Sequence, residues 1–236
     1  MGTKLTVYDI AQMIDHSLLR PTLTDPEFFE GIELARKYKC ATVCVAPYDV
    51  PRSVELLKGS PVRVSTVVDF PHGSNMIESK VFEANLALDR GASELDMVLA
   101  ISRLVAGTYD YVEADIRAVV EAAHARGAVV KVIFETCYLT PEMIIKGCEL
   151  SERAGADYVK TSTGYGSRGA SLDDVRLMRK SCSPKVAVKA SGGIRTLDDV
   201  LEYRKAGTKM IGTLASAAIL DEAARREAAG TLQELD

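Results

Sequence analysis

The amino-acid sequence predicts an α/β fold in which eight strands close into a (β/α)8 barrel, the TIM barrel. From Ala41 onward, short runs rich in valine and isoleucine alternate with amphipathic stretches, which is typical of repeated βα units and a parallel sheet. Eight such units fit into the 236 residues without a break in composition, a linker or a low-complexity tract, so we expect one domain over residues 1–236. An open doubly wound sheet is disfavoured because no G-x-G-x-x-G turn follows the first strand and no P-loop pattern occurs.

The strands of this barrel are expected at regular intervals along the chain. The first, over residues 14–18, has the weakest pattern. The other seven are expected over residues 42–46, 63–69, 94–99, 129–135, 158–161, 186–190 and 208–211.

Capping signals mark the helices between the strands. Thr24, Thr140 and Thr196 each precede a first turn that is acidic or contains proline, so each is expected to begin a helix. Glycines at positions 91, 127, 155 and 207 follow expected helix ends and lead into the next strand. The apolar segment before Asp15 predicts an extra N-terminal helix that closes the bottom of the barrel, and a charged, alanine-rich helix is expected after Asp221.

Composition and charge exclude several classes of function. The net charge of −4 and the pI near 5.5 give no reason to expect nucleic-acid binding, and no apolar run approaches the roughly 18 residues of a membrane span. The amino terminus lacks the apolar segment of a secretory signal. The five cysteines are an odd number without zinc-like spacing, so reduced thiols are expected. Together these features indicate a cytoplasmic protein that binds neither nucleic acid nor membrane.

Two lysines at equivalent strand ends are the most informative feature of the sequence. Lys160 ends one apolar run before a turn of small residues, and Lys189 has the same place in the next expected strand. Two charges about 6 Å apart on such strands repel by roughly 3 kcal/mol at an effective dielectric constant of about 20, which equals about two pKa units. One amine is therefore expected to be largely neutral, and a neutral lysine amine can form a Schiff base with a carbonyl substrate. A single strand-end lysine would more often be exposed or paired with a carboxylate, but the paired pattern favours the chemical role.

An acid inside an apolar strand is the third candidate. Asp96 should share its face of the strand with Glu94 and Val98, because strand side chains alternate between the two faces. A buried carboxylate needs a partner, and Lys189 across the barrel mouth is the obvious cation. The two residues form either a structural ion pair or, with a water molecule, the proton relay beside a Lys160 imine.

Two further pairs of polar residues are candidates for the site. Lys131 and Glu135 are an even number of positions apart and would face the same side of one strand, which suggests a structural pair on the floor of the site. Asp15 and His16 either hold a substrate hydroxyl or cap the extra N-terminal helix.

The histidines do not support a metal site. His16 and His72 are placed where they can reach the barrel mouth, whereas His124 lies in an amphipathic run and is expected to be exposed. No H-x-x-x-H or H-E-x-x-H spacing and no G-x-S-x-G elbow occurs, so neither metal-assisted aldol chemistry nor hydrolysis is expected.

Small residues after the last two strands suggest a phosphate site. Phosphate groups in such barrels bind to backbone N–H groups after strands seven and eight and at a helix amino terminus. Ser191, Gly192 and Gly193 follow the seventh expected strand, and Gly212 and Thr213 follow the eighth if it ends at residue 211. Tight turns without a ligand are the alternative.

Several long motifs, in the same order, resemble those of the deoxyribose-phosphate aldolases, class I aldolases with a (β/α)8 fold. The similarity covers residues 10–219. Its motifs are DH at 15–16, TVCV at 42–45, FPHG at 70–73, ELDMV at 94–98, KVIFETC at 131–137, VKTSTG at 159–164 and VKASGGIR at 188–195.

The resemblance implies a reaction and roles for individual residues. Lys160 would be the Schiff-base lysine, with Asp96 and Lys189 as its proton-transfer partners. The reaction would be the reversible cleavage of 2-deoxyribose 5-phosphate to glyceraldehyde 3-phosphate and acetaldehyde, without an added cofactor or metal, in a homo-oligomer such as a dimer or tetramer. Substrate contacts are expected from Asp15, Cys44, Lys131, Thr161, Gly164, Ser191, Gly192, Gly193 and Gly212.

The chain departs from this family's pattern where the phosphate is held. After the eighth strand the family usually has two serines, and this chain has Leu214 and Ala215 at those positions. Ala46 replaces an asparagine that often precedes the proline after strand two, and no basic residue directly follows Gly164, although Arg168 is near. Two alternatives therefore remain: the same aldol chemistry with weaker phosphate selectivity, and a barrel that has lost catalysis and senses a sugar phosphate. The second is disfavoured because such a barrel would have no reason to keep the lysine pair.

Overall fold

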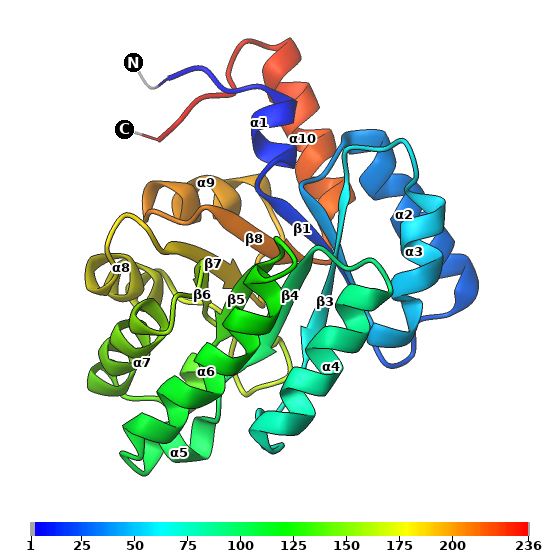
Figure 1. Cartoon of the computed structure of the whole chain (residues 1–236). Coiled ribbons are helices and arrows are strands. Elements are labelled where there is room, and N and C mark those ends of the chain that lie inside the picture. The colour runs from blue at the N-terminus through cyan, green and yellow to red at the C-terminus, as the bar shows by residue number, and fades with distance from the viewer. Residues whose placement is uncertain (1–2, 236) are drawn as a thin grey trace.

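The computed structural model describes residues 3–235, so residues 1, 2 and 236 of the expected domain lie outside it. Its parallel strands form a closed barrel in chain order, which confirms the predicted (β/α)8 fold (Figure 1). The strands are β1 (Ile14–Leu18), β2 (Thr42–Val45), β3 (Arg63–Val68), β4 (Glu94–Val98), β5 (Val129–Ile133), β6 (Tyr158–Lys160), β7 (Ala187–Ser191) and β8 (Met210–Thr213).

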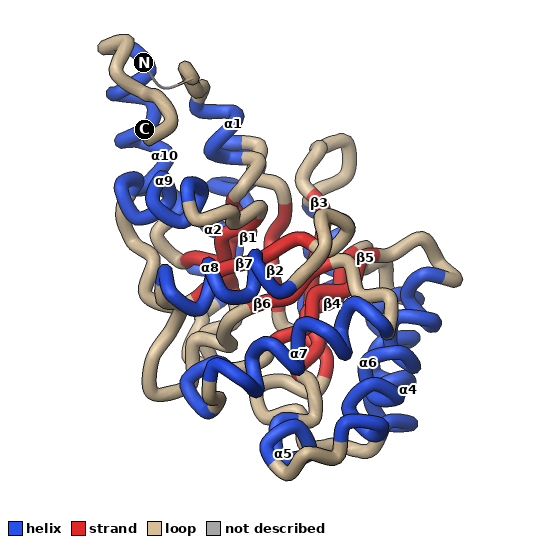
Figure 2. The backbone as a smooth tube through the Cα atoms, turned by 90° about the vertical axis from the view of Figure 1, so that its left-hand side faces the viewer, coloured by secondary structure: helices blue, strands red, loops and turns tan. Residues whose placement is uncertain are grey.

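Helices surround the strands, and the view turned by 90° shows the strands at the centre of the molecule (Figure 2). The α-helices are α1 (Val7–Ala11), α2 (Asp25–Tyr38), α3 (Val50–Leu56), α4 (Ile77–Asp89), α5 (Ile101–Val105), α6 (Tyr109–His124), α7 (Pro141–Arg153), α8 (Leu172–Ser181), α9 (Leu197–Lys205) and α10 (Ser216–Ala228). Two short 3-10 helices, η1 (Pro47–Asp49) and η2 (Thr136–Tyr138), follow β2 and β5. Within residues 3–235 no helix combines the length and the apolar character needed to cross a bilayer.

The predicted helix starts are confirmed. Thr24, Thr140 and Thr196 directly precede α2, α7 and α9. The Thr196 hydroxyl accepts a hydrogen bond from the N–H of Asp199, whose carboxylate accepts one from the N–H of Thr196 at 2.9 Å. These reciprocal bonds satisfy N–H groups that have no partner within the helix.

The extra N-terminal helix is present and joins the two ends of the chain. Ile10 and Ala11 of α1 are buried, and α1 packs against α10 near the amino end of β1 (Figure 1). The N–H of Leu5 donates to the carbonyl of Leu232 at 3.1 Å. The terminal helix begins at Ser216, earlier than the expected start after Asp221.

The last strand lies further along the chain than expected. The N–H of Thr208 bonds to the carbonyl of Tyr203 at 3.0 Å and so closes the end of α9, and β8 begins only at Met210. Gly212 and Thr213 therefore lie within the strand, and the expectation that they follow it is wrong. Gly212 pairs with Ser191 of β7.

Candidate active site

The two strand-end lysines stand side by side in the barrel. Lys160 of β6 pairs in register with Lys189 of β7, as the sequence pattern predicts. The Nζ atoms of both lysines lie 2.6 Å from the same oxygen, Oδ2 of Asp96 in β4. All three side chains are almost completely buried. The structure thus brings together the three residues with predicted catalytic roles.

A third lysine completes this group, with different partners from those expected. The Nζ atom of Lys131 lies 2.8 Å from Oδ1 of Asp96 and 2.6 Å from Oε2 of Glu94, which shares a face of β4 with Asp96 as predicted. The predicted pair of Lys131 and Glu135 is wrong. Because β5 ends at Ile133 and Glu135 has a φ of 55°, strand alternation does not extend to Glu135. Its carboxylate instead accepts hydrogen bonds from Thr163.

Asp15 belongs to the same ionic group. Its carboxylate contacts the Lys189 ammonium group and accepts a hydrogen bond from the hydroxyl of Thr42 on β2. Thr6 and Gln12 are the caps of helix α1, and the side chains of Asp15 and His16 bond to Thr42 and Ser216 instead, so the alternative in which they cap this helix is wrong.

His16 and His124 lie away from the ionic group. His16 points to the helix layer, where its Nδ1 lies 2.8 Å from the hydroxyl oxygen of Ser216, so the expectation that it can reach the mouth is wrong. Adjacent strand residues face opposite sides, and Asp15 takes the inward position. Burial lowers the pKa of His16 to about 4. His124 is exposed as predicted, and its Nε2 lies 2.9 Å from Asp157.

The electrostatics of the site distinguish its lysines. Burial lowers the pKa of Lys160, and the adjacent Lys189 charge adds to this effect while Asp96 opposes it. Burial also acts against the charge of Lys189, but the carboxylates of Asp15 and Asp96 outweigh it and raise the pKa of Lys189. The pKa of Asp96 lies well below its usual value despite burial, because the ammonium groups surround it. Lys160 is therefore the amine that loses its proton most readily, and Asp96 stays ionised.

A cavity of about 470 Å³ gives access to Lys160. Eight of the predicted site residues line it, namely Asp15, Cys44, Lys160, Gly164, Ser191, Gly192, Gly193 and Gly212. Asp96, Lys131 and Lys189 lie behind this surface in the ionic group. Thr161 is buried outside the cavity lining, and its hydroxyl accepts a hydrogen bond from the N–H of Ser191 at 3.1 Å. Four predicted residues thus support the cavity without lining it.

The phosphate end of the cavity has glycine turns but few free hydroxyl groups. Gly192 and Gly193 have φ values of 87° and 84°, which favour glycine, and a Cβ atom on Gly192 would lie 2.8 Å from Gly169. Leu214 lines the cavity and is 58% exposed. The hydroxyl of Thr213 donates to the carbonyl of Ile194 at 2.8 Å and is therefore already engaged.

Sequence reasoning missed several residues of the cavity wall. Leu19, Arg20, Pro21, Tyr165 and Arg195 all line it. Arg195 lies two residues after Gly193 and Tyr165 directly follows Gly164, so their closeness in the sequence to predicted site residues could have indicated them. No sequence pattern indicated Leu19, Arg20 and Pro21 after β1, because only tertiary packing places them at the cavity.

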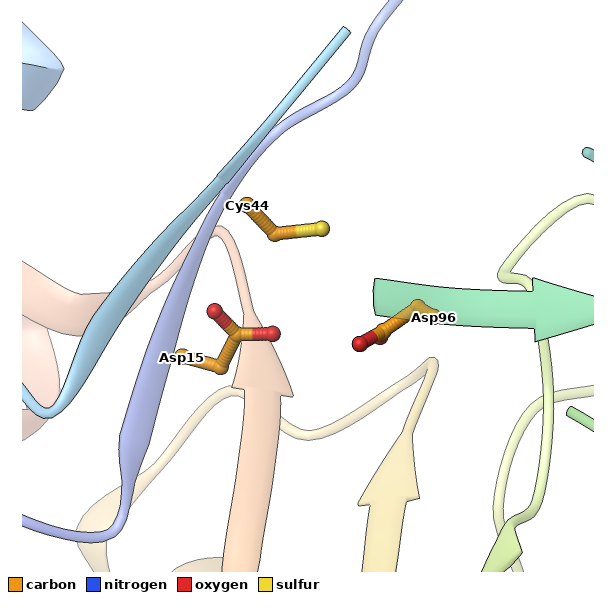
Figure 3. Close-up of side chains that lie close together, drawn as sticks. All are labelled: Asp15, Cys44 and Asp96. Carbon is orange, nitrogen blue, oxygen red and sulfur yellow. The ribbon is translucent and has the colours of Figure 1, made fainter. Parts of the chain in front are cut away.

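The buried acids could suggest a metal site, but their surroundings do not suit one. The side chains of Asp15, Cys44 and Asp96 point toward a common space, and their possible ligand atoms lie within 4.8 Å of one another (Figure 3). Lysine ammonium groups already contact both carboxylates. Burial and the Asp15 charge raise the pKa of Cys44 to about 12, so its sulfur is a thiol and a poor ligand. A dication would have to displace cations that the site already holds.

Comparison with known proteins identifies the family. Residues 10–219 match the model of the DeoC/LacD family aldolases. The chain belongs to this family. The DeoC/LacD aldolases similar to it include the deoxyribose-phosphate aldolase of Caldanaerobacter subterraneus subsp. tengcongensis, which is 50% identical over 92% of this chain and 94% of that relative. The deoxyribose-phosphate aldolase of Thermococcus gammatolerans is also 50% identical, over 93% of this chain and 98% of that protein.

A solved member of the family supports the same fold. The tetrameric deoxyribose phosphate aldolase from Aeropyrum pernix superposes with a TM-score of 0.86 and 32% identity, and the match covers 92% of each chain. A second solved aldolase, QR15, gives a TM-score of 0.89 and 37% identity over 94% of this chain and 98% of its own. The resemblance seen in the sequence motifs is thus confirmed over most of the chain.

Proposed function

We propose that this aldolase reversibly cleaves 2-deoxyribose 5-phosphate to glyceraldehyde 3-phosphate and acetaldehyde through a Schiff base on Lys160. The observation that carries the proposal is a buried lysine with a lowered pKa at the cavity, next to Asp96 and Lys189. The names of the relatives that are 50% identical support the substrate. The chain then acts as one catalytic domain and needs no cofactor.

The chemistry assigns a task to each group. The neutral amine of Lys160 attacks the C1 aldehyde, and loss of water gives an iminium ion. When a proton leaves the C3 hydroxyl, the bond between C2 and C3 breaks, glyceraldehyde 3-phosphate departs, and the electron pair enters the enamine on Lys160. Protonation at C2 and hydrolysis then release acetaldehyde. Asp96 and Lys189, with a water molecule, form the unit that moves these protons.

The other site residues bind the substrate or support those that do. Asp15 lines the cavity near Lys160 and holds a substrate hydroxyl, and Cys44, also on the wall, contacts the sugar carbon chain. The backbone N–H groups of Gly192 and Gly193 attract the phosphate, and Gly164 leaves room for it. Ser191 fixes the start of this turn, and Gly212 allows β8 to pass close to Ser191, because a Cβ atom there would lie 2.9 Å from the Ser191 Cβ. Lys131 and Thr161 hold Asp96 and Ser191 in place from behind the cavity wall.

A second candidate is the same reaction with weaker phosphate selectivity. Leu214 and Ala215 line the cavity where the family usually has serines, and the hydroxyl of Thr213 is engaged with the backbone. Each missing hydrogen bond to a charged group weakens binding by about 1.5–3 kcal/mol. Comparing kcat/KM for deoxyribose 5-phosphate with that for deoxyribose distinguishes the two candidates.

Borohydride trapping tests the covalent step. Incubation with acetaldehyde and borohydride should add one ethyl group to Lys160, detected by mass spectrometry of the digested protein. Lys160→Arg should lose the adduct, and the matched control Lys58→Arg, at an exposed lysine, should keep it. Absence of an adduct, or an adduct on Lys189 alone, would contradict the proposal.

A homo-oligomeric, cytoplasmic enzyme completes the proposal. Phe82 and Leu86 lie one turn apart on α4 and are 71% and 46% exposed, so together they offer an apolar contact surface to a second copy of the chain. The Aeropyrum pernix relative is described as a tetramer. Light scattering should therefore give a mass above 25.5 kDa, and Phe82→Glu should lower it.

The five cysteines are free, as suits a reducing compartment, and fractionation of the host cells tests the location.

A further inference from the structure

A second cavity adjoins the catalytic one. It has a volume of about 240 Å³ and opens beside the segment that follows β3. The two cavities share two lining residues, Thr163 and Tyr165. These residues form the partition between the cavities.

The two halves of this partition differ in how firmly they are held. Thr163 is buried, and both its N–H and its hydroxyl donate to the carboxylate of Glu135. The ring of Tyr165 is 48% exposed. Its hydroxyl donates to the carbonyl of Leu19 at 2.8 Å, and its ring meets that of Phe70 edge to face at 5.6 Å between centroids. The Tyr165 ring is thus the part of the partition that is less firmly held, because one hydrogen bond and one aromatic contact fix it.

The cavities differ in the chemistry that they offer a ligand. The catalytic cavity is lined by Arg20 and Arg195 as well as by the glycine turns, which suits an anionic group. Among residues 3–235, neither a lysine nor an arginine lines the second cavity. Its wall includes Pro71, His72, Ile101 and Ser102, and the carboxylate of Glu135, which also lines it, is engaged with Thr163. Without a lysine or an arginine on its described wall, this cavity suits a neutral chain better than a phosphate dianion.

We propose that Tyr165 is a specificity-determining residue of the aldol reaction: its ring limits the length of the neutral acceptor aldehyde, and the second cavity binds the distal part of longer ones. This inference rests on the proposed function, because it concerns the aldehyde that reacts with the acetaldehyde enamine. Phosphorylated acceptors remain in the catalytic cavity, where the cationic groups lie.

The test measures kcat/KM for the addition of acetaldehyde to propanal and to hexanal. The quantity of interest is the ratio of the hexanal value to the propanal value. Because both acceptors react with the same enamine, this ratio does not depend on how a substitution affects enamine formation. Tyr165→Ala should raise this ratio at least about tenfold, because additional methylene groups become buried in the second cavity. Tyr165→Phe keeps the ring and should leave the ratio near that of the wild type. Tyr165→Leu, which removes the ring but keeps an apolar side chain, should give an intermediate increase.

A double variant identifies the second cavity as the place where the longer chain binds. Ser102→Leu narrows that cavity, so in the Tyr165→Ala background it should return the ratio toward the wild-type value. An unchanged ratio in both Tyr165→Ala and Tyr165→Leu, or a ratio that Ser102→Leu does not lower, would overturn the inference. If the wild type gives a borohydride adduct and a propanal product while the ratio stays constant, only this inference fails. If the wild type gives neither, the proposed function fails as well.

Discussion

Lys160 and Lys189 contact the same carboxylate oxygen, Oδ2 of Asp96, at the same distance of 2.6 Å, yet their pKa values are shifted in opposite directions. The difference comes from Asp15, whose carboxylate contacts Lys189. With two carboxylates beside it, Lys189 keeps its proton and its charge disfavours a second charge on Lys160. The arrangement creates one amine that can react and one cation that can donate or hold a proton.

Replacement of the reactive amine tests its covalent role in catalysis. Lys160→Arg keeps a positive charge but offers no amine that is neutral near pH 7. We expect less than about a hundredth of the wild-type kcat/KM for deoxyribose 5-phosphate, a loss of more than roughly 3 kcal/mol of transition-state stabilisation. Lys58→Arg is the matched control, and a Lys160→Arg enzyme with higher activity than this limit would rule out the imine.

Removal of the neighbouring charge should alter the pH dependence of the reaction. In Lys189→Leu the pKa of Lys160 should rise, because a repelling charge is gone and Asp96 has one cation fewer. A higher pKa leaves less neutral amine at a given pH. The acid limb of the pH profile of borohydride trapping should therefore move to higher pH than in the wild type. An acid limb at the same pH as in the wild type would show that Lys189 does not affect the pKa of Lys160.

Coupling between Lys189 and Asp96 can be measured in the same series. Asp96→Asn should still allow trapping but slow the later proton transfers. If the two residues act as one unit, the loss of kcat in the double variant should be smaller than the product of the two single losses. Losses that multiply would argue for independent roles.

Restored serines should strengthen the grip on phosphate. Leu214→Ser with Ala215→Ser adds two hydroxyl groups to the wall of the catalytic cavity. We expect kcat/KM for deoxyribose 5-phosphate to rise about tenfold or more, equivalent to about 1.4 kcal/mol, with little change for deoxyribose. Equal changes for both substrates would mean that these positions do not contact the phosphate.

His16 should make the stability of the barrel sensitive to acid. Its pKa is about 4 in the folded protein, because of burial, and about 6.5 in an unfolded chain. Below pH 6.5 the unfolded state therefore binds a proton that the folded state does not, and stability falls until the pH reaches about 4. The loss at pH 5 should be about 2 kcal/mol. Thermal unfolding at pH 7 and pH 5 should show a smaller difference in Tm for His16→Asn than for the wild type, and an equal difference would exclude this histidine as the cause.

The sequence predicted those parts of the site that depend on strand periodicity. Lys160, Lys189 and Asp96 could be placed because parallel strands align equivalent positions at one end of a barrel. The predicted pair of Glu135 and Lys131 is wrong because Glu135, beyond the end of β5, itself has a left-handed backbone that interrupts the alternation of side chains, and no local sequence pattern predicts this conformation. The position of Tyr165 between two cavities depends on contacts with Leu19 and Phe70, which are distant in the chain. Such contacts exist only after the barrel closes.

The contacts around Asp96 join segments that are far apart in the chain. Lys160 and Asp96 are 64 residues apart, and Lys189 and Asp15 are 174 residues apart. In an unfolded chain every lysine has a pKa near 10.4 and is protonated at neutral pH. Burial is the largest cause of the lowered pKa of Lys160 and the charge of Lys189 adds to it, so the reactive amine arises only when the barrel has closed around both lysines. A nascent or partly unfolded chain carries no unusually nucleophilic lysine, so the same closure that completes folding also keeps incomplete molecules from reacting with the aldehydes around them.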